Sequence, residues 1–165
     1  MATQQSDQRQ PDYRKYPIDD HGKLRFQYFS VGILTPITVA YAANDQVELF
    51  KLPPGRKRIL PWLSRIQWTA FGAGRTLDLG HRAFMARPPA DADPTVENGD
   101  AFLDGVDVSA AQTTPLAWAT PDDVNASQMK YDLYSIDEMV VFMTILGGTM
   151  PIGAKLSGFC AYIYE

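Results

Sequence analysis

Cysteine and histidine are scarce in this chain, with one cysteine and two histidines among 165 residues. Cys160 has no second cysteine to pair with inside the chain, and its apolar neighbours favour a small buried side chain over a reactive thiol. His21 and His81 are too few for a histidine-rich zinc site and too far apart for an HExxH pair. A single cysteine also fits folding in a reducing cytoplasm, where we expect the protein to be made.

Long hydrophobic runs are also lacking. No apolar run approaches the ~18 residues of a membrane-spanning helix, so we expect no membrane partner. The first ten residues are polar and have no hydrophobic centre, which argues against a signal peptide. The chain has no phosphate-binding loop, no dinucleotide-binding glycine motif and no G-x-S-x-G elbow. We therefore expect no cofactor and no enzymatic activity.

The residues that are present suit one soluble globular domain. Hydrophobic residues make up 45%, aromatic residues 12% and charged residues 21% of the chain, which is ordinary for a folded protein. The 12 glycines and 12 prolines slightly exceed the typical share of about 12% for the two together. This excess favours a turn-rich fold over a helical bundle.

The first 22 residues predict an extended arm, followed by a single domain over residues 23–165. The arm is polar, contains two prolines and has no hydrophobic period. It still carries aromatic and basic side chains that could order on a partner surface, and we take as candidate contacts Arg9, Tyr13, Arg14, Lys15 and Tyr16. The alternative is a frayed terminus.

The domain is patterned as short strands separated by turn residues. The predicted strands cover residues 23–30, 37–42, 46–52, 59–71, 75–80, 128–135, 138–147 and 155–164. Their spacing predicts an all-β fold, a jelly-roll-like antiparallel β-sandwich.

Four local predictions concern turns and the type of individual elements. Residues 37–42 and 46–52 are expected to form a hairpin, and residues 101–111 a helical turn followed by a loop. A capping box at Ser135 would allow a helix over 139–146, but the β-branched residues there favour a strand. The glycine pair after that strand suits a hairpin to the last strand.

Charge is distributed unevenly along the chain. Residues 51–87 carry eight basic and one acidic side chain, whereas residues 91–138 carry one basic and eleven acidic ones. The two blocks could form opposite faces that meet between subunits, with candidate pairing residues Arg56, Lys57, Arg58, Asp100, Asp104 and Asp107. Alternatively, folding interleaves them as solvated loop charges. The net charge of −4 argues against nucleic acid as the main partner.

Two weaker candidates for a catalytic or metal-binding site remain. His81 could act as a base, although a hydrogen-bonded histidine at a strand end is the commoner situation. The acidic stretch Asp91, Asp93, Glu97 and Asp100 lacks the spacing of an EF-hand, so calcium is a minor alternative to a solvated loop.

The three tryptophans invite a sugar-binding interpretation. Trp68 falls on the apolar side of its strand and is expected to pack in the core. Trp62, next to a proline and basic residues, is the better candidate for an exposed aromatic contact, and Trp118 is the other candidate for a sugar contact.

Four segments carry a resemblance to a known group of proteins. They read QVELFKLPPGRKRI, IQWTAFGAGRTLDLGHRAF, AFLDGVDVSAA and EMVVFMTILGGTMPIGAKLSGFCAYIYE. In this order they resemble small virion proteins of tailed bacteriophages, and the similarity runs from about residue 46 to residue 165. The motifs describe turns and strands, not chemistry.

The resemblance implies a jelly-roll or β-sandwich module that decorates or cements the phage head. Its expected partners are the major capsid protein lattice and further copies of itself, with a homotrimer favoured, and its expected location is the capsid surface of the virion. Alternatives are another virion location, such as a fibre or spike base, a carbohydrate-binding module, or an enzyme.

Overall fold

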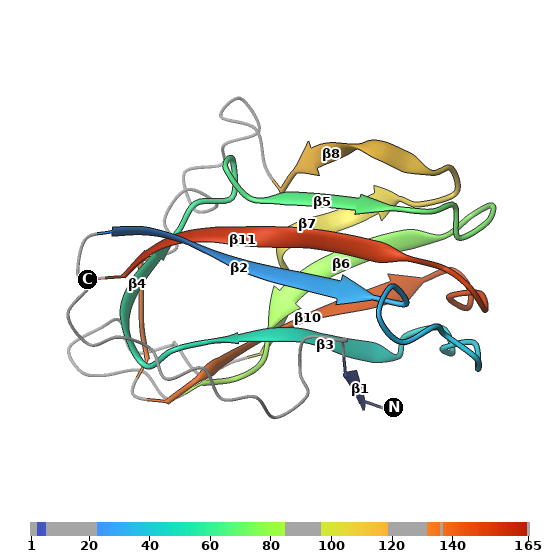
Figure 1. The fold of residues 1–165 in the computed structure, drawn as a ribbon. Helices are drawn as coiled ribbons and strands as arrows, with labels where there is room; N and C mark the ends of the chain where they lie inside the picture. Colours follow the sequence, from blue (N-terminus) through green and yellow to red (C-terminus); the bar gives the residue numbers. More distant parts are fainter. Residues whose placement is uncertain (1–2, 6–22, 85–96, 119–131, 136, 165) are drawn as a thin grey trace.

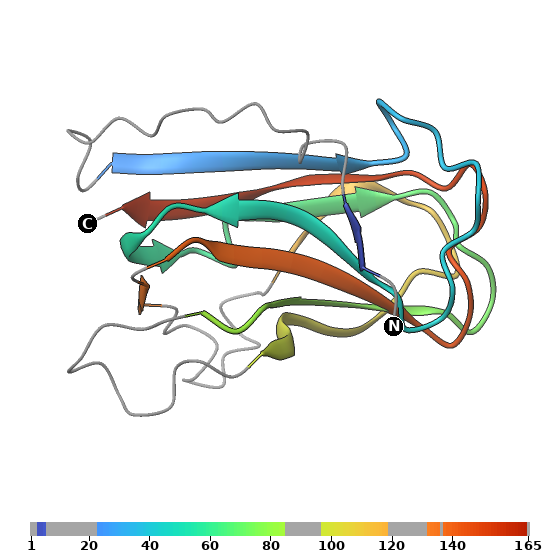
Figure 2. The ribbon, with the colours of Figure 1, turned by 90° about the horizontal axis from the view of Figure 1, so that it is seen from below.

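The computed structural model describes residues 3–5, 23–84, 97–118, 132–135 and 137–164. These residues form strands, turns and loops without a helix. The strands make two sheets that pack face to face as a sandwich (Figures 1 and 2). The prediction of an all-β, jelly-roll-like sandwich is therefore confirmed.

The first sheet has five strands in the order β1-β3-β10-β6-β7. They are β1 (Thr3–Gln5), β3 (Gln46–Leu52), β10 (Met139–Leu146), β6 (Thr76–His81) and β7 (Asn98–Asp107). All pairings are antiparallel except that of β1 with β3, which is parallel. Strand β7 forms one edge of this sheet, and β1 and β3 lie at the other.

The second sheet is built around the last strand. Its members are β2 (Lys23–Val31), β11 (Leu156–Tyr164), β4 (Gly55–Ile59), β5 (Arg65–Trp68), β8 (Gln112–Ala117) and β9 (Asp132–Ser135). Strand β2 pairs with β11 along nine consecutive residues without a register shift. On its other side β11 pairs first with β5 and then with β4.

The core fills the space between the sheets. Strand alternation turns Val47 and Leu49 of β3, Leu77 and Leu79 of β6, and Met143 of β10 inward, where all five are buried. Burying apolar surface in this way contributes roughly 25 cal/mol per Å². This core fixes which face of each sheet is left for contact with other molecules.

Ser64 bridges the point where β11 changes neighbours. Between β4 and β5 the chain makes a turn, and the fully buried Ser64 hydroxyl accepts a hydrogen bond from the Ala161 N–H at 2.9 Å. The same hydroxyl donates to the Leu60 carbonyl at 2.9 Å. The Leu60 N–H in turn donates to the Ala161 carbonyl at 2.9 Å. The backbone groups of Ala161 are thus satisfied on the side where neither β4 nor β5 reaches them.

The predicted hairpin over residues 37–52 is wrong. Residues 37–42 are loop, apart from a bridge between Tyr41 and Met150. The tight turn before β3 does form, with Asn44 at a φ of 66° and the Ala42 N–H donating to Asp45 at 2.9 Å. The hairpin partner is displaced because β10 and β1 occupy the two sides of β3.

Two further predictions need correction. Residues 98–107 form strand β7 and not a helical turn, because Leu103 and Val106 pair with Leu79 and Leu77 of β6. The glycine turn after β10 does not close a hairpin, because β10 and β11 belong to different sheets. The prediction that residues 139–146 form a strand, and not a helix, is confirmed.

The predicted arm falls almost wholly outside the described residues. Its described part is β1, which adds a short parallel strand to the edge of β3 through the pairs Thr3 with Gln46 and Gln5 with Glu48. The division into an arm and a single domain stays a prediction.

Replacing Ser64 with alanine should lower the free energy of unfolding by about 1–3 kcal/mol, because the buried Ala161 N–H would lose its acceptor. Urea denaturation measures the change. Ser157→Ala is the matched control, since Ser157 is a half-buried serine on β11 that accepts only a side-chain hydrogen bond from Gln67. Equal losses in the two variants would contradict this role of Ser64.

Candidate interaction surface

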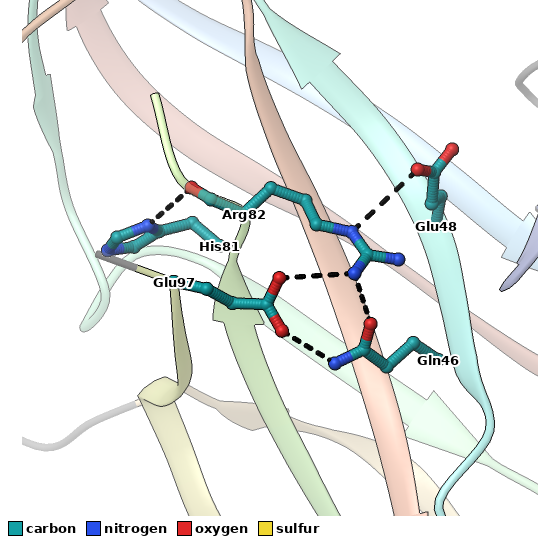
Figure 3. Close-up of polar contacts among 5 residues, drawn as sticks. All are labelled: Gln46, Glu48, His81, Arg82 and Glu97. Carbon is teal, nitrogen blue, oxygen red and sulfur yellow. Dashed lines mark hydrogen bonds and ion pairs between the residues drawn. The ribbon is translucent and has the colours of Figure 1, made fainter. Parts of the chain in front are cut away.

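A polar network lies at the end of β6, and Figure 3 shows its members. The Arg82 guanidinium donates to Glu97 at 3.1 Å and to the side-chain oxygen of Gln46, and it lies 3.9 Å from Glu48. The Gln46 amide donates to the other Glu97 oxygen at 2.8 Å. The network therefore ties β3 to the end of β6 and the start of β7.

The network covers a buried ring. Phe142 of β10 is fully buried but does not belong to the core cluster. The Arg82 guanidinium carbon lies 4.9 Å from the centre of the Phe142 ring, a distance at which a cation attracts an aromatic face. The Arg82 network thus acts as a structural cover on the outer side of the first sheet.

His81 and Cys160 have the surroundings of structural residues. The His81 ring is buried against Phe84 and Phe102, and its Nδ1 lies 3.0 Å from the Arg82 carbonyl oxygen. Burial lowers the pKa of His81, so the ring is neutral at pH 7 and Nδ1 donates to the carbonyl. Burial also raises the pKa of the Cys160 thiol above its ordinary range. The expectations of a hydrogen-bonded histidine and a small buried cysteine are confirmed.

Within the described ranges, no group of three or more His, Cys, Asp and Glu side chains is placed to hold a metal ion. Of the weak calcium candidates, Glu97 is engaged by Arg82 and Gln46, and Asp91 and Asp93 lie outside the described residues. The same described part of the chain contains no helix long and apolar enough to cross a bilayer.

The basic residues of β4 point to opposite sides of the second sheet. Arg56 is exposed and Arg58 is half-buried, whereas Lys57 between them is fully buried. Strand alternation explains the difference, because neighbouring side chains point to opposite faces. Lys57 therefore does not lie on the protomer surface with the other two. Burial lowers its pKa to about 8, partly offset by Asp137.

The acidic candidates gather on strand β7. Asp100, Asp104 and Asp107 are all exposed. Beside them, Asp78 of β6 accepts a hydrogen bond from the Gly105 N–H at 2.8 Å. Partial burial and the charges of Asp104 and Asp100 raise the pKa of Asp78. We call Asp78, Asp100 and Asp104 the acidic edge.

The tryptophans divide between core and surface. Trp118 is buried against Phe29, Phe50 and Phe102, so it is unavailable as a sugar platform. Trp68 is buried and its Nε1 donates to the Ala110 carbonyl at 3.0 Å, which confirms that it packs in the core. Trp62 is 37% exposed, as expected, and its role as a contact stays a prediction.

An aromatic patch covers the outer face of the second sheet, the face nearest the viewer in Figure 1. We define it as Leu24, Phe26 and Tyr28 of β2 with Phe159 and Ile163 of β11. The register pairs Tyr28 with Phe159 and Leu24 with Ile163, so these side chains share one face. Leu24, Phe26 and Tyr28 are 46%, 43% and 59% exposed.

Strand β2 turns Leu24, Phe26 and Tyr28 outward and buries Phe29 and Val31. Alternation in the sequence places the first three side chains on one side of a strand, but it does not tell which side faces the core. The direction could have been predicted from Phe29 and Val31, which continue the strand. Both are apolar, and alternation places them on the side opposite to Leu24, Phe26 and Tyr28.

Arginines border the aromatic patch. The register places Arg65 of β5 opposite Phe159 and Arg58 of β4 opposite Ile163, so both extend the same outer face. Arg65 is held by the carbonyls of Trp62, at 2.6 Å, and Ser64, at 2.9 Å.

The predicted arm contacts lie outside the described residues. They are Arg9, Tyr13, Arg14, Lys15 and Tyr16.

Replacing Lys57 with methionine should remove a pH dependence of stability. The folded-state pKa of about 8 lies below the ordinary 10.5, so the unfolded chain binds more protons between these values and stability rises with pH across that window. At pH 7 the variant should be more stable by up to about 3 kcal/mol.

Urea midpoints at pH 7, 8 and 10 measure this effect. Lys155→Met, which removes an exposed lysine, is the matched control. If the urea midpoint of Lys57→Met changed with pH as steeply as that of the wild type, the burial of Lys57 would not be the cause of the pH dependence of stability.

Comparisons with known proteins give a likeness of fold. No family model matches the chain, and no curated protein matches it. Among solved structures, it is similar to a chain from the capsid of Ralstonia phage GP4, with a TM-score of 0.67 and 22% sequence identity. The similarity covers 99% of both chains. The two chains therefore share one fold.

Proposed function

We propose that this chain is a virion structural protein of a tailed bacteriophage that binds the assembled head and stabilises it. The observation that carries the proposal is the likeness of fold, over 99% of both chains, to a chain from a phage capsid. The four segments that resemble small virion proteins support it independently, since they were recognised from turns and strand patterns in the sequence.

The described residues suit such a role. Their histidine and cysteine are engaged in packing, and the Arg82 network braces one sheet. The features that face outward are an aromatic patch, arginines and an acidic edge. Aromatic residues and arginines are enriched in binding surfaces between proteins, and opposite charges across such a surface add specificity.

Stabilisation would follow from linkage. A protein that binds the assembled lattice and not its free subunits favours the assembled state by mass action. Because a head offers many equivalent sites, modest affinities multiply over the lattice. This role requires a rigid module with well-defined binding surfaces, and it requires no catalysed reaction.

We further propose that the protein acts as a trimer on the capsid surface. A contact around a three-fold axis must be heterologous, joining two different surfaces of the same chain. Arg56 and Arg58 on one subunit and Asp100, Asp104 and Asp107 on the next have the required opposite charge. The arm residues Arg9, Tyr13, Arg14, Lys15 and Tyr16 would contact the capsid protein or a neighbouring subunit.

The test is co-sedimentation with heads prepared without this protein. The full chain should pellet with the heads and raise the temperature at which they break open. A chain starting at Lys23 should bind at least about tenfold more weakly if the arm contributes contacts.

A second variant is the full-length chain with Arg9, Arg14 and Lys15 replaced by glutamine. It keeps the arm's length and removes three of its proposed contacts, so it should also bind more weakly than the unchanged chain. A full chain that stays in the supernatant at every concentration would contradict head binding. Binding to purified tails instead would move the protein to another virion location.

A further inference from the structure

We propose that the aromatic patch, with Arg58 and Arg65 beside it, is the docking surface for the acidic edge of a second copy of this chain. The inference rests on the proposed function, since it names the partner of one surface of the virion module. It adds an apolar centre and Arg65 to the charge pairing of Arg58 with the acidic residues of the next copy.

The patch has the composition of a binding hot spot. Such sites are rich in tyrosine, tryptophan and arginine and carry most of the energy of an interface. Here Phe26 and Phe159 meet edge to face with ring centres 5.4 Å apart, and Tyr28 lies 5.6 Å from Phe159. The rings already hold one another in place, so little side-chain entropy would be lost on binding.

The position of the patch is unusual for a soluble antiparallel sheet. Such a sheet turns apolar residues to the core and polar residues to water. Strand β2 instead has apolar residues on both faces, with Phe29 and Val31 buried and Leu24, Phe26 and Tyr28 exposed. A contiguous apolar surface of this kind marks an interaction site more often than a solvated face.

Charge complementarity identifies the occupant. Arg58 and Arg65 make the margin of the patch basic, and the same chain carries a compact acidic surface on its other sheet. Asp100 and Asp104 both act on Asp78 and oppose its ionisation. An arginine brought by a second copy would relieve this repulsion and gain charge-assisted hydrogen bonds.

The two surfaces cannot meet within one molecule. The patch lies on the outer face of the second sheet, whereas β7 is an edge strand of the first. Figures 1 and 2 show these sheets as separate layers. The contact is therefore heterologous, and it forms a closed ring when the rotation between copies is a simple fraction of a turn.

Two variants disable the two surfaces separately. Phe26→Thr with Tyr28→Thr removes the rings while keeping residues that favour strands, and Asp100→Lys with Asp104→Lys reverses the acidic edge. Sedimentation velocity over a range of concentrations should show the wild type assembling and each variant assembling at least about tenfold more weakly.

Mixing the two variants gives the decisive result. Each variant retains the surface that the other lacks, so an equimolar mixture should form a pair of one copy of each and stop there. Val39→Thr with Ile152→Thr, which changes two apolar residues that are 73% and 66% exposed elsewhere, is the matched control and should assemble as the wild type does. Circular dichroism melting curves identify any variant that fails to fold.

A mixture that stays monomeric, or variants that assemble like the wild type, would overturn the inference. A monomeric wild type that still pellets with heads would overturn the inference and leave the proposed function intact. A wild type that assembles but does not pellet with heads would overturn the proposed function and leave this inference intact. Loss of head binding in the Phe26 and Tyr28 variant without a change in mass would assign the patch to the head instead.

Discussion

Strand β11 is the element on which the second sheet depends. It pairs with β2 along one side over nine residues, and with β5 and β4 in succession along the other. On that second side neither β5 nor β4 pairs with Ala161, and the turn through Leu60 and Ser64 satisfies its backbone groups there. Strand β11 is therefore the element that joins β2, β4 and β5 into one sheet.

The same ladder sets the outer surface of the protein. An antiparallel register brings directly opposed side chains onto one face. It therefore gathers Tyr28 with Phe159, and Arg65 with Phe159, from three strands that lie far apart in the sequence. The first sheet is organised by a comparable device, since Arg82 gathers Gln46 and Glu97 over the Phe142 ring. One sheet thus presents an apolar face and the other a polar one.

Much of the fold could be predicted from the period of the sequence, because alternation and turn residues are local signals. The direction of each strand's apolar side was not available, because the period of two is the same whichever face turns inward. Lys57 shows the consequence, since it was grouped with Arg56 and Arg58 but lies on the opposite side of the sheet.

The partners with which strands pair and side chains pack could not be predicted from the local sequence either. Residues 101–111 were expected to form a helical turn followed by a loop, and the pairing of residues 98–107 with β6 makes them a strand instead. Trp118 was weighed as a sugar contact, and its packing with Phe29, Phe50 and Phe102 comes from three strands distant in the chain. The acidic edge could be predicted in part, since Asp100 and Asp104 were singled out, whereas their proximity to Asp78 follows only from the pairing of β6 with β7.

On the proposed function, this chain is a rigid sandwich whose surfaces bind an assembled phage head. Electron cryo-microscopy of heads with and without the bound chain tests this claim most directly. The account predicts additional density of the size of this sandwich, repeated at symmetry-related positions on the outside of the head, with neighbouring copies in contact. A map of the saturated heads identical to that of the bare heads would contradict it.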